Sequence, residues 1–176
     1  MKVLLNDSSV LLNLLAADCL AEIVKATGWQ FAICPAVRDE AKKLRDADTG
    51  EMRDVDLAPL IESGLLQVLE LADEAEQTLY VEQAVAVDDG EAMSIAIAAS
   101  RRLELAIDDK QASNHTKRAF PELKLWTTPE IIKHWSDQAK ISAGELKSAI
   151  SAIEARARYF PPRSHALAVW WSFAKA

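Results

Sequence analysis

The chain has 176 residues, half of them hydrophobic, which suits one domain with a sizeable core, with or without an extension. Its net charge of −7 excludes a protein that binds nucleic acid by blanket neutralisation of phosphates, but not an enzyme whose bound cations supply positive charge locally. The N-terminus is too polar for a signal peptide, no apolar run approaches membrane-spanning length, and Cys19 and Cys34 lack metal-ligand spacing. We therefore expect a cytoplasmic protein with two reduced thiols and no membrane contact.

Short apolar runs alternate along the chain with longer segments of helical spacing. We expect strands at residues 3–7, 31–34, 66–71, 103–107 and 123–126. Helices are expected at 9–26 (one or two), 35–44, 57–62, 73–85, 91–102, 114–120 and from Thr128 onward, whereas the charged segment 45–56 reads as a loop or mobile region. Strands that alternate with helices predict an α/β fold with a parallel, helix-flanked sheet.

The pattern changes after residue 137. We interpret residues 1–137 as the main domain and residues 138–176 as a C-terminal helical extension. One amphipathic helix is expected over Ala143–Tyr159. The following segment, residues 166–173, is strongly apolar and rich in tryptophan, so it either docks on its own domain or meets a partner.

Acidic residues follow two of the expected strands. Asp7 comes at the end of the first strand, and Asp108 and Asp109 close the fourth. In open α/β sheets, ligands bind outside the carboxyl ends of the strands, where the first strand often flanks the point at which strand order reverses. Asp7 therefore faces the expected crevice, and one of Asp108 and Asp109 has the alternative role of capping the next helix.

Two further acids are candidates with clear structural alternatives. Glu40 shares a helical face with Ala36, Val37 and Leu44, so it is expected among core-facing residues, where it needs a metal or a basic partner. Glu91 lies in the first turn of its helix, where an acid is commonly only a cap and dipole partner.

Four short motifs carry a resemblance to a known family. They are Asp7–Leu11, Pro35–Glu40, Gly90–Ala98 and Ile107–Lys110, and in this order and approximate spacing the chain resembles PIN domains over roughly residues 1–135. The resemblance implies a three-layer α/β/α sandwich with a five-stranded parallel sheet of order 3-2-1-4-5. The last motif departs from the pattern Thr-x-Asp, because Ile107 replaces the Thr; the register favours Asp109, and Asp108 is kept as well.

The resemblance also implies a function and a site. It implies a metal-dependent ribonuclease that uses Mg²⁺ or Mn²⁺, with the toxin of a toxin–antitoxin pair as its role, an RNA substrate, an antitoxin partner and a homodimer. The implied metal and catalytic acids are Asp7, Glu40, Glu91, Asp108 and Asp109, with Ser9 supporting Asp7. Carboxylates suit this chemistry because they hold hard divalent cations, which activate water and relieve charge on phosphoryl oxygens.

Two other readings compete with the nuclease. In one, the acids are silent and the protein is an interaction module that acts through its C-terminal tail. In the other, it is a phosphotransfer domain, but Ser9 stands where a phosphatase of the haloacid-dehalogenase type needs a second Asp, and Glu70 and Asp73 poorly match the phospho-accepting Asp of a receiver.

Basic and aromatic residues near the expected site have open roles. A set of basic residues either guides the phosphate backbone of a nucleic acid or is simply exposed to solvent. The set is Arg38, Lys42, Lys43, Lys110, Lys117 and Arg118. Two roles are open for the tryptophans, stacking on nucleic-acid bases and packing in the core or an interface, and packing is preferred. They are Trp126, Trp135, Trp170 and Trp171. His115 and His134 are interpreted as helix-surface residues and not as metal ligands.

Overall fold

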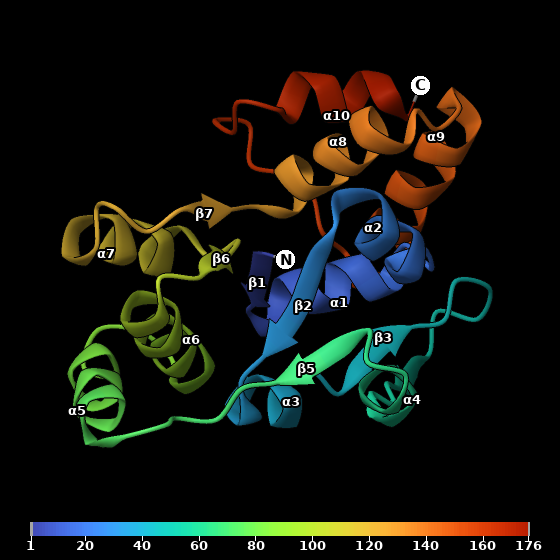
Figure 1. The fold of residues 1–176 in the computed structure, drawn as a ribbon. Helices are drawn as coiled ribbons and strands as arrows, with labels where there is room; N and C mark the ends of the chain where they lie inside the picture. Colours follow the sequence, from blue (N-terminus) through green and yellow to red (C-terminus); the bar gives the residue numbers. More distant parts are fainter. Residues whose placement is uncertain (1, 176) are drawn as a thin grey trace.

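A computed structural model describes residues 2–175 and contains a five-stranded parallel sheet (Figure 1). Its strands are β1 (Lys2–Asn6), β2 (Trp29–Ile33), β5 (Leu66–Val68), β6 (Glu104–Ala106) and β7 (Leu125–Trp126). They lie in the order β5-β2-β1-β6-β7, with every neighbouring pair parallel. Counted along the chain, these five strands have the order 3-2-1-4-5, which confirms the predicted topology.

Strand β1 lies at the centre of the sheet, and its apolar composition fits burial on both faces. Leu4 and Leu5 are fully buried, and β2 is buried along its whole length, as expected for strands with a helix layer on each face. Asn6 pairs with Ala106 in the adjacent strand β6, so the carboxyl ends of β1 and β6 lie side by side. The next residues of both strands therefore leave the sheet at one point of its edge.

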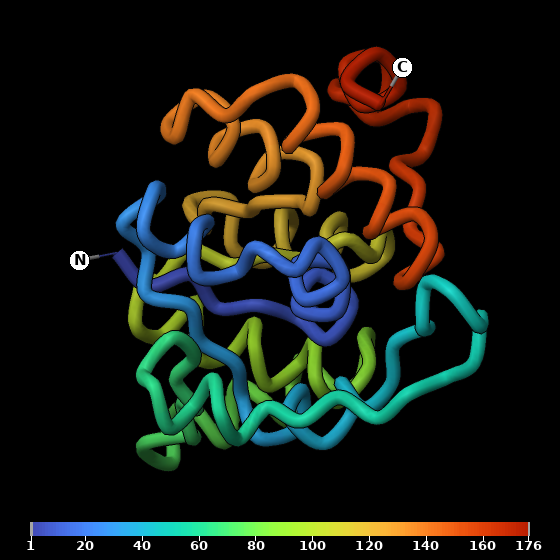
Figure 2. Tube along the Cα trace, turned by 90° about the vertical axis from the view of Figure 1, so that its right-hand side faces the viewer, coloured from blue at the N-terminus to red at the C-terminus, as the bar shows by residue number. Residues whose placement is uncertain are grey.

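Helices cover both faces of the sheet. In Figure 2 the orange helices of the C-terminal half lie on one side and the green helices on the other. The helices are α1 (Ser8–Ala16), α2 (Leu20–Thr27), α3 (Pro35–Glu40), α4 (Ala58–Glu62), α5 (Glu74–Gln83), α6 (Asp89–Arg101), α7 (Lys110–Ala119) and α8 (Thr128–Ala139). Helices α1 and α2 both contact α8, whereas α6 contacts α3 and α5. None of the described helices is long and apolar enough to span a membrane.

The segment after α3 differs from the expectation. The predicted helix over 35–44 was too long, because α3 ends at Glu40 and Ala41 has a non-helical backbone (ψ 65°). Strand β3 (Lys43–Arg45) follows and pairs antiparallel with β4 (Met52–Asp54). The charged region expected as a loop is thus a hairpin, which is held on the domain by the buried Leu44.

Two other helix boundaries differ from those expected from the sequence. The helix expected to begin at Asn114 begins at Lys110, because Asp109 caps it: its Oδ1 accepts a hydrogen bond from the Ala112 backbone N–H at 2.8 Å. The helix expected over Ala143–Tyr159 is α9 (Ala143–Ala152) followed by one π-helical turn, η1 (Ile153–Ala157).

The C-terminal segment packs against its own chain. Ala149, Ile150, Ile153 and Trp171 join the same hydrophobic cluster as Leu11 and Leu14 of α1. The tail forms α10 (Ala168–Ala174), whose Trp171 is 1% exposed and donates from Nε1 to Glu154 at 2.9 Å. Of the two alternatives for the tail, docking on its own domain is therefore the one observed, and the proposed boundary at residue 137 stays a prediction.

Candidate active site

Asp7 leaves the sheet directly after the central strand. Its backbone N–H donates to the carbonyl of Ala106 at 3.0 Å, which extends the pairing of β1 with β6 by one residue. Its side chain caps α1, with Oδ1 accepting from the Val10 N–H at 2.7 Å, and Ser9 Oγ lies 3.1 Å from each carboxylate oxygen. The expected support of Asp7 by Ser9 is thus present, and the side chain is held in one orientation.

Asp108 lies beside Asp7 and is held by four donors. Oδ1 accepts from the Thr128 N–H at 2.9 Å and from the Tyr159 hydroxyl at 3.2 Å. Oδ2 accepts from Asn13 Nδ2 at 2.9 Å and from Thr128 Oγ1 at 2.6 Å. Because a carboxylate offers about four lone-pair sites, these four donors favour its ionised form. Helices α1 and α8 and the chain after η1 together fix this carboxylate.

The two carboxylates share a buried environment. The Asp108 N–H lies 3.4 Å from Asp7 Oδ2, and Asp7 is only 3% exposed. Burial, followed by the negative charge of Asp108, raises the pKa of Asp7 to about 8. Burial also raises the pKa of Asp108, although the hydrogen bonds from Thr128, Tyr159 and Asn13 oppose that rise. The inner pair, Asp7 and Asp108, thus places two acidic groups together where there is little water, and Asp7 keeps its proton at neutral pH unless a cation binds.

Three more acids form an outer set, Glu40, Glu91 and Asp109. Glu91 completes the capping box of α6, since its Oε2 accepts from the Asp88 N–H at 3.3 Å. Glu40 Oε1 accepts from the Gly90 N–H at 3.2 Å, which links the end of α3 to the start of α6. The pKa of Glu91 is raised to about 7 by burial first, and the charges of Asp109 and Glu40 add to this rise.

The structure separates the predicted acids into these two groups. Within residues 2–175, no three side chains of His, Cys, Asp or Glu are placed to hold one metal ion together. Over the same residues, none of the five acids forms an ion pair with lysine or arginine. The acids are therefore neither one preformed cage nor a set of neutralised surface charges.

The expectation for Glu40 needs a correction. Its placement among core-facing residues assumed that the helix continued to Leu44, but α3 ends at Glu40 and the side chain is exposed. Asp108 and Asp109 divide the two roles that the sequence left open. Asp109 caps α7, and Asp108 lies next to Asp7.

The sequence interpretation missed three residues at the inner pair. Asn13 is 3% exposed within the apolar run Val10–Ala16 of α1, and this polar residue among apolar ones was a signal that was not used. Thr128 is fully buried at the start of α8, a position that suggests only a helix start. Tyr159 gave no signal, because its hydroxyl reaches Asp108 only through the packing of the C-terminal segment.

The predicted basic and aromatic residues have different environments. Arg38 pairs with Asp39 and Lys43 with Asp54, whereas Lys110, Lys117 and Arg118 line cavities along α7. Packing is confirmed for the tryptophans Trp135 and Trp171, which are buried, and Trp126 stacks edge-on against Trp29 at 4.7 Å between ring centroids. His134 also packs against Trp29, with ring centroids 4.9 Å apart.

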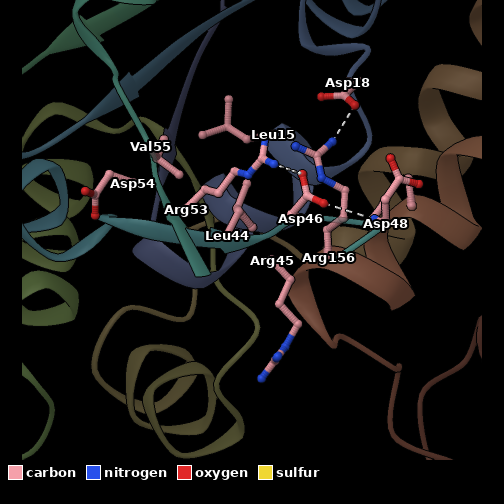
Figure 3. A pocket seen from close by; sticks show the side chains of 12 residues that line it. Leu15, Asp18, Leu44, Arg45, Asp46, Asp48, Arg53, Asp54, Val55 and Arg156 are labelled. Carbon is pink, nitrogen blue, oxygen red and sulfur yellow. Dashed lines mark hydrogen bonds and ion pairs between the residues drawn. The ribbon is translucent and has the colours of Figure 1, made fainter. Parts of the chain in front are cut away.

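A separate pocket of about 530 Å³ lies between the hairpin β3–β4, the end of α1 and η1 (Figure 3). Two ion pairs line it: Arg156 contacts Asp18, and Arg53 contacts Asp46 at 3.0 Å. None of the five predicted acids lines it. One ion pair thus joins η1 to the end of α1, the other lies within the hairpin region, and the pocket is not part of the acidic site.

Comparison with known proteins agrees with this geometry. A family model described as a PIN domain matches residues 3–169, which include α9 and η1 as well as the sheet. Neither the curated proteins nor the solved structures with which the chain was compared include a match. The order of the five parallel strands and the match over nearly the whole length agree, and the chain belongs to the PIN-domain family.

Proposed function

We propose that this chain is a metal-dependent ribonuclease that hydrolyses phosphodiester bonds of RNA. PIN domains are generally nucleases and usually bind a divalent metal ion. The observation that supports the proposal best is the inner pair, in which the buried Asp7 and the half-buried Asp108 stand at adjacent strand ends and no basic residue within 2–175 pairs with either.

The donor set fits Mg²⁺ or Mn²⁺. Both ions prefer oxygen ligands, and Mg²⁺ typically takes only one or two carboxylates together with waters and phosphate oxygens, so a cage of three acids is not required. Asp7 and Asp108, or Asp109 on the outer side, would ligate the ion, and Glu40 and Glu91 would complete the shell directly or through water. When bound, the ion supplies an activated water and relief of charge on the phosphoryl oxygens.

Hydrogen bonds within the chain hold the two carboxylates of the inner pair in position. Asn13, Thr128 and Tyr159 hold Asp108 in one rotamer, and Ser9 and the first turn of α1 do the same for Asp7. Either Glu40, which accepts from the Gly90 N–H, or Glu91, which accepts from the Asp88 N–H, orients the attacking water. Burial of Asp7 excludes competing bulk water from the inner pair.

The variant Asp7→Asn tests the assignment. Asn caps a helix as well as Asp does, so α1 and the fold are expected to persist, with thermal unfolding close to that of the wild type. Cleavage of RNA by the wild type in Mg²⁺ or Mn²⁺ should be lost in EDTA and fall at least about 100-fold in the variant. Asp137→Asn, at a surface acid paired with Lys133, is the matched control and should keep full activity. Unchanged cleavage by highly purified Asp7→Asn protein would refute the assignment.

As the biological role we propose the cytoplasmic toxin of a toxin–antitoxin pair, acting as a homodimer. Exposed apolar side chains of the C-terminal segment, Phe160, Val169 and Phe173, are candidates for the contact with a second copy or an antitoxin. Light scattering tests the dimer, and growth arrest on expression, relieved by the product of a neighbouring reading frame, tests the toxin role. A strictly monomeric particle or harmless expression of active enzyme would contradict these two proposals.

The same exposed side chains favour one alternative, a catalytically silent PIN-like module that acts through its C-terminal tail. RNA cleavage that requires metal and is lost in EDTA separates the two functions. A purified protein that binds a partner through the tail but cleaves no RNA in Mg²⁺ or Mn²⁺ would favour the module.

A further inference from the structure

A cleft of about 530 Å³ opens next to Asp108, between α7, β7 and the chain at residues 162–165. Its volume lies within the range of cavities that hold small ligands. Ile107, Leu123 and Leu125 give it an apolar floor, and Lys110, Asn114 and Lys117 of α7 line one side. The cleft thus combines an apolar surface with charged and amide groups beside a proposed metal ligand.

The α7 side of the cleft carries positive charge without a partner. Lys110, Asn114 and Lys117 follow a spacing of four and three residues, so they project from one face of the helix. Neither lysine forms an ion pair within residues 2–175. The same three residues also border a second, shallower cavity of about 780 Å³ that reaches Asp109 and Arg118. The chain as a whole has a net charge of −7, and the acids Asp108 and Asp109 repel a phosphate. Lys110 and Lys117 place positive charge beside these acids, where it can attract the phosphate.

The opposite wall is fixed in place. His165 Nε2 lies 3.0 Å from Thr127 Oγ1, and the His165 Nδ1 accepts the Leu167 N–H at 3.0 Å. Nδ1 is therefore the acceptor nitrogen, and Nε2 carries the proton and donates to Thr127. The His165 N–H also donates to the Pro162 carbonyl at 2.8 Å, so residues 162–165 form a closed turn that is held on the start of α8. These hydrogen bonds hold that wall of the cleft in position.

We propose that this cleft binds one nucleotide of single-stranded RNA adjacent to the scissile phosphate, an inference that rests on the proposed nuclease function. Lys110 and Lys117 contact the phosphate, the apolar floor receives the base or sugar, and Asn114 hydrogen-bonds a base edge. A concave site favours a single strand, because unstacked bases can enter a hollow whereas duplex RNA presents its backbone to a broad surface. The C-terminal segment thus supplies one wall of the substrate site.

Binding without metal tests the cleft independently of catalysis. Fluorescence anisotropy of 5′-fluorescein-labelled hexaribonucleotides of A, C, G and U, in EDTA, compares the wild type with Lys117→Ala and Asn114→Ala. Lys25→Ala is the matched control, because Lys25 is exposed and forms no ion pair within residues 2–175, and because α2 leads into β2, on the other side of β1 from β6 and β7. Circular dichroism and thermal unfolding of each variant verify its fold.

Distinct results are expected from the two α7 variants. Lys117→Ala should lower the affinity for all four oligomers about three- to tenfold. It should also reduce the slope of log affinity against log salt concentration by about one. Asn114→Ala should weaken some of the four more than the others, and Lys25→Ala should change none. If both α7 variants bind with the affinity of the wild type, or if folded wild-type protein binds none of the oligomers, the proposal that the cleft binds RNA is wrong.

Cleavage assays in Mg²⁺ or Mn²⁺ separate this failure from a failure of the nuclease. If the wild type cleaves RNA, Lys117→Ala should raise KM at least threefold with kcat within about twofold. If the wild type is active and Lys117→Ala leaves KM unchanged, the proposal that the cleft binds RNA is wrong, whereas the proposed nuclease function is supported. Binding that depends on Lys117 and Asn114, without any cleavage, would support the cleft and overturn the nuclease.

Discussion

Tyr159 connects the C-terminal segment to the inner pair, and Tyr159→Phe measures the strength of that connection. The π-helical turn η1 ends at Ala157, the backbone of the next residue, Arg158, is left-handed (φ 57°), and the chain then turns Tyr159 toward the site. The ring packs edge-on against Trp171 with centroids 6.0 Å apart, and the hydroxyl donates to Asp108 at 3.2 Å. Burial, followed by the charge of Asp108, raises the pKa of Tyr159, so the hydroxyl keeps its proton at neutral pH.

The expected loss of stability follows from this geometry. A hydrogen bond to a charged acceptor contributes roughly 1.5–3 kcal/mol. The 3.2 Å distance is long for an O–H···O bond, and Asp108 keeps three other donors, so we expect a loss of about 1–1.5 kcal/mol in the free energy of unfolding. In a chain of this length, that loss lowers Tm by roughly 2–6 °C.

Urea and thermal unfolding at pH 7 measure the loss. Tyr80→Phe is the matched control, because it removes the hydroxyl that donates to the exposed Asp89 and should cost less than about 0.5 kcal/mol. If Tyr159→Phe is no more destabilising than Tyr80→Phe, the hydroxyl does not hold Asp108 and the reasoning fails. In an active enzyme, Tyr159→Phe should also raise the Mn²⁺ concentration for half-maximal cleavage, by up to about tenfold.

Three further substitutions test other parts of the fold. The hydrogen bond from Arg101 lowers the pKa of the buried Glu76 to about 2, so its contribution of about 2 kcal/mol is complete above pH 4.5 and lost as pH falls through 2. Urea unfolding of Glu76→Gln should show that loss at pH 7 and little difference from the wild type near pH 2. Trp171→Ala should cost about 3–5 kcal/mol in the same assay, because the side chain is 1% exposed; a cost under about 1 kcal/mol would mean that the tail is not docked. In Gly90→Ala, the new Cβ would lie 2.6 Å from Glu40 Oε2, so the flexible carboxylate should move away. Stability should then stay within about 1 kcal/mol while cleavage falls; full activity would show that Glu40 is dispensable in this position.

The sequence by itself determined the elements and the acids that follow them. Buried apolar runs mark β1 and β2 because strands covered on both faces have no polar side. Gly28 marks the end of α2, where it adopts φ 68°, and Asp73 marks the start of α5, whose N–H groups need an acceptor. These signals are local, since each depends on the backbone of a few consecutive residues.

Only the tertiary structure decided which groups meet. Asp108 and Asp109 are neighbours in sequence, and a shift of one residue exchanges the side chain that lies next to Asp7 for the one that caps α7, so composition alone leaves both open. The hairpin β3–β4 and the contact between Tyr159 and Asp108 likewise depend on pairing and packing between distant segments. Local spacing carries no information about such long-range contacts, because their geometry is set when the helix layers close on the sheet.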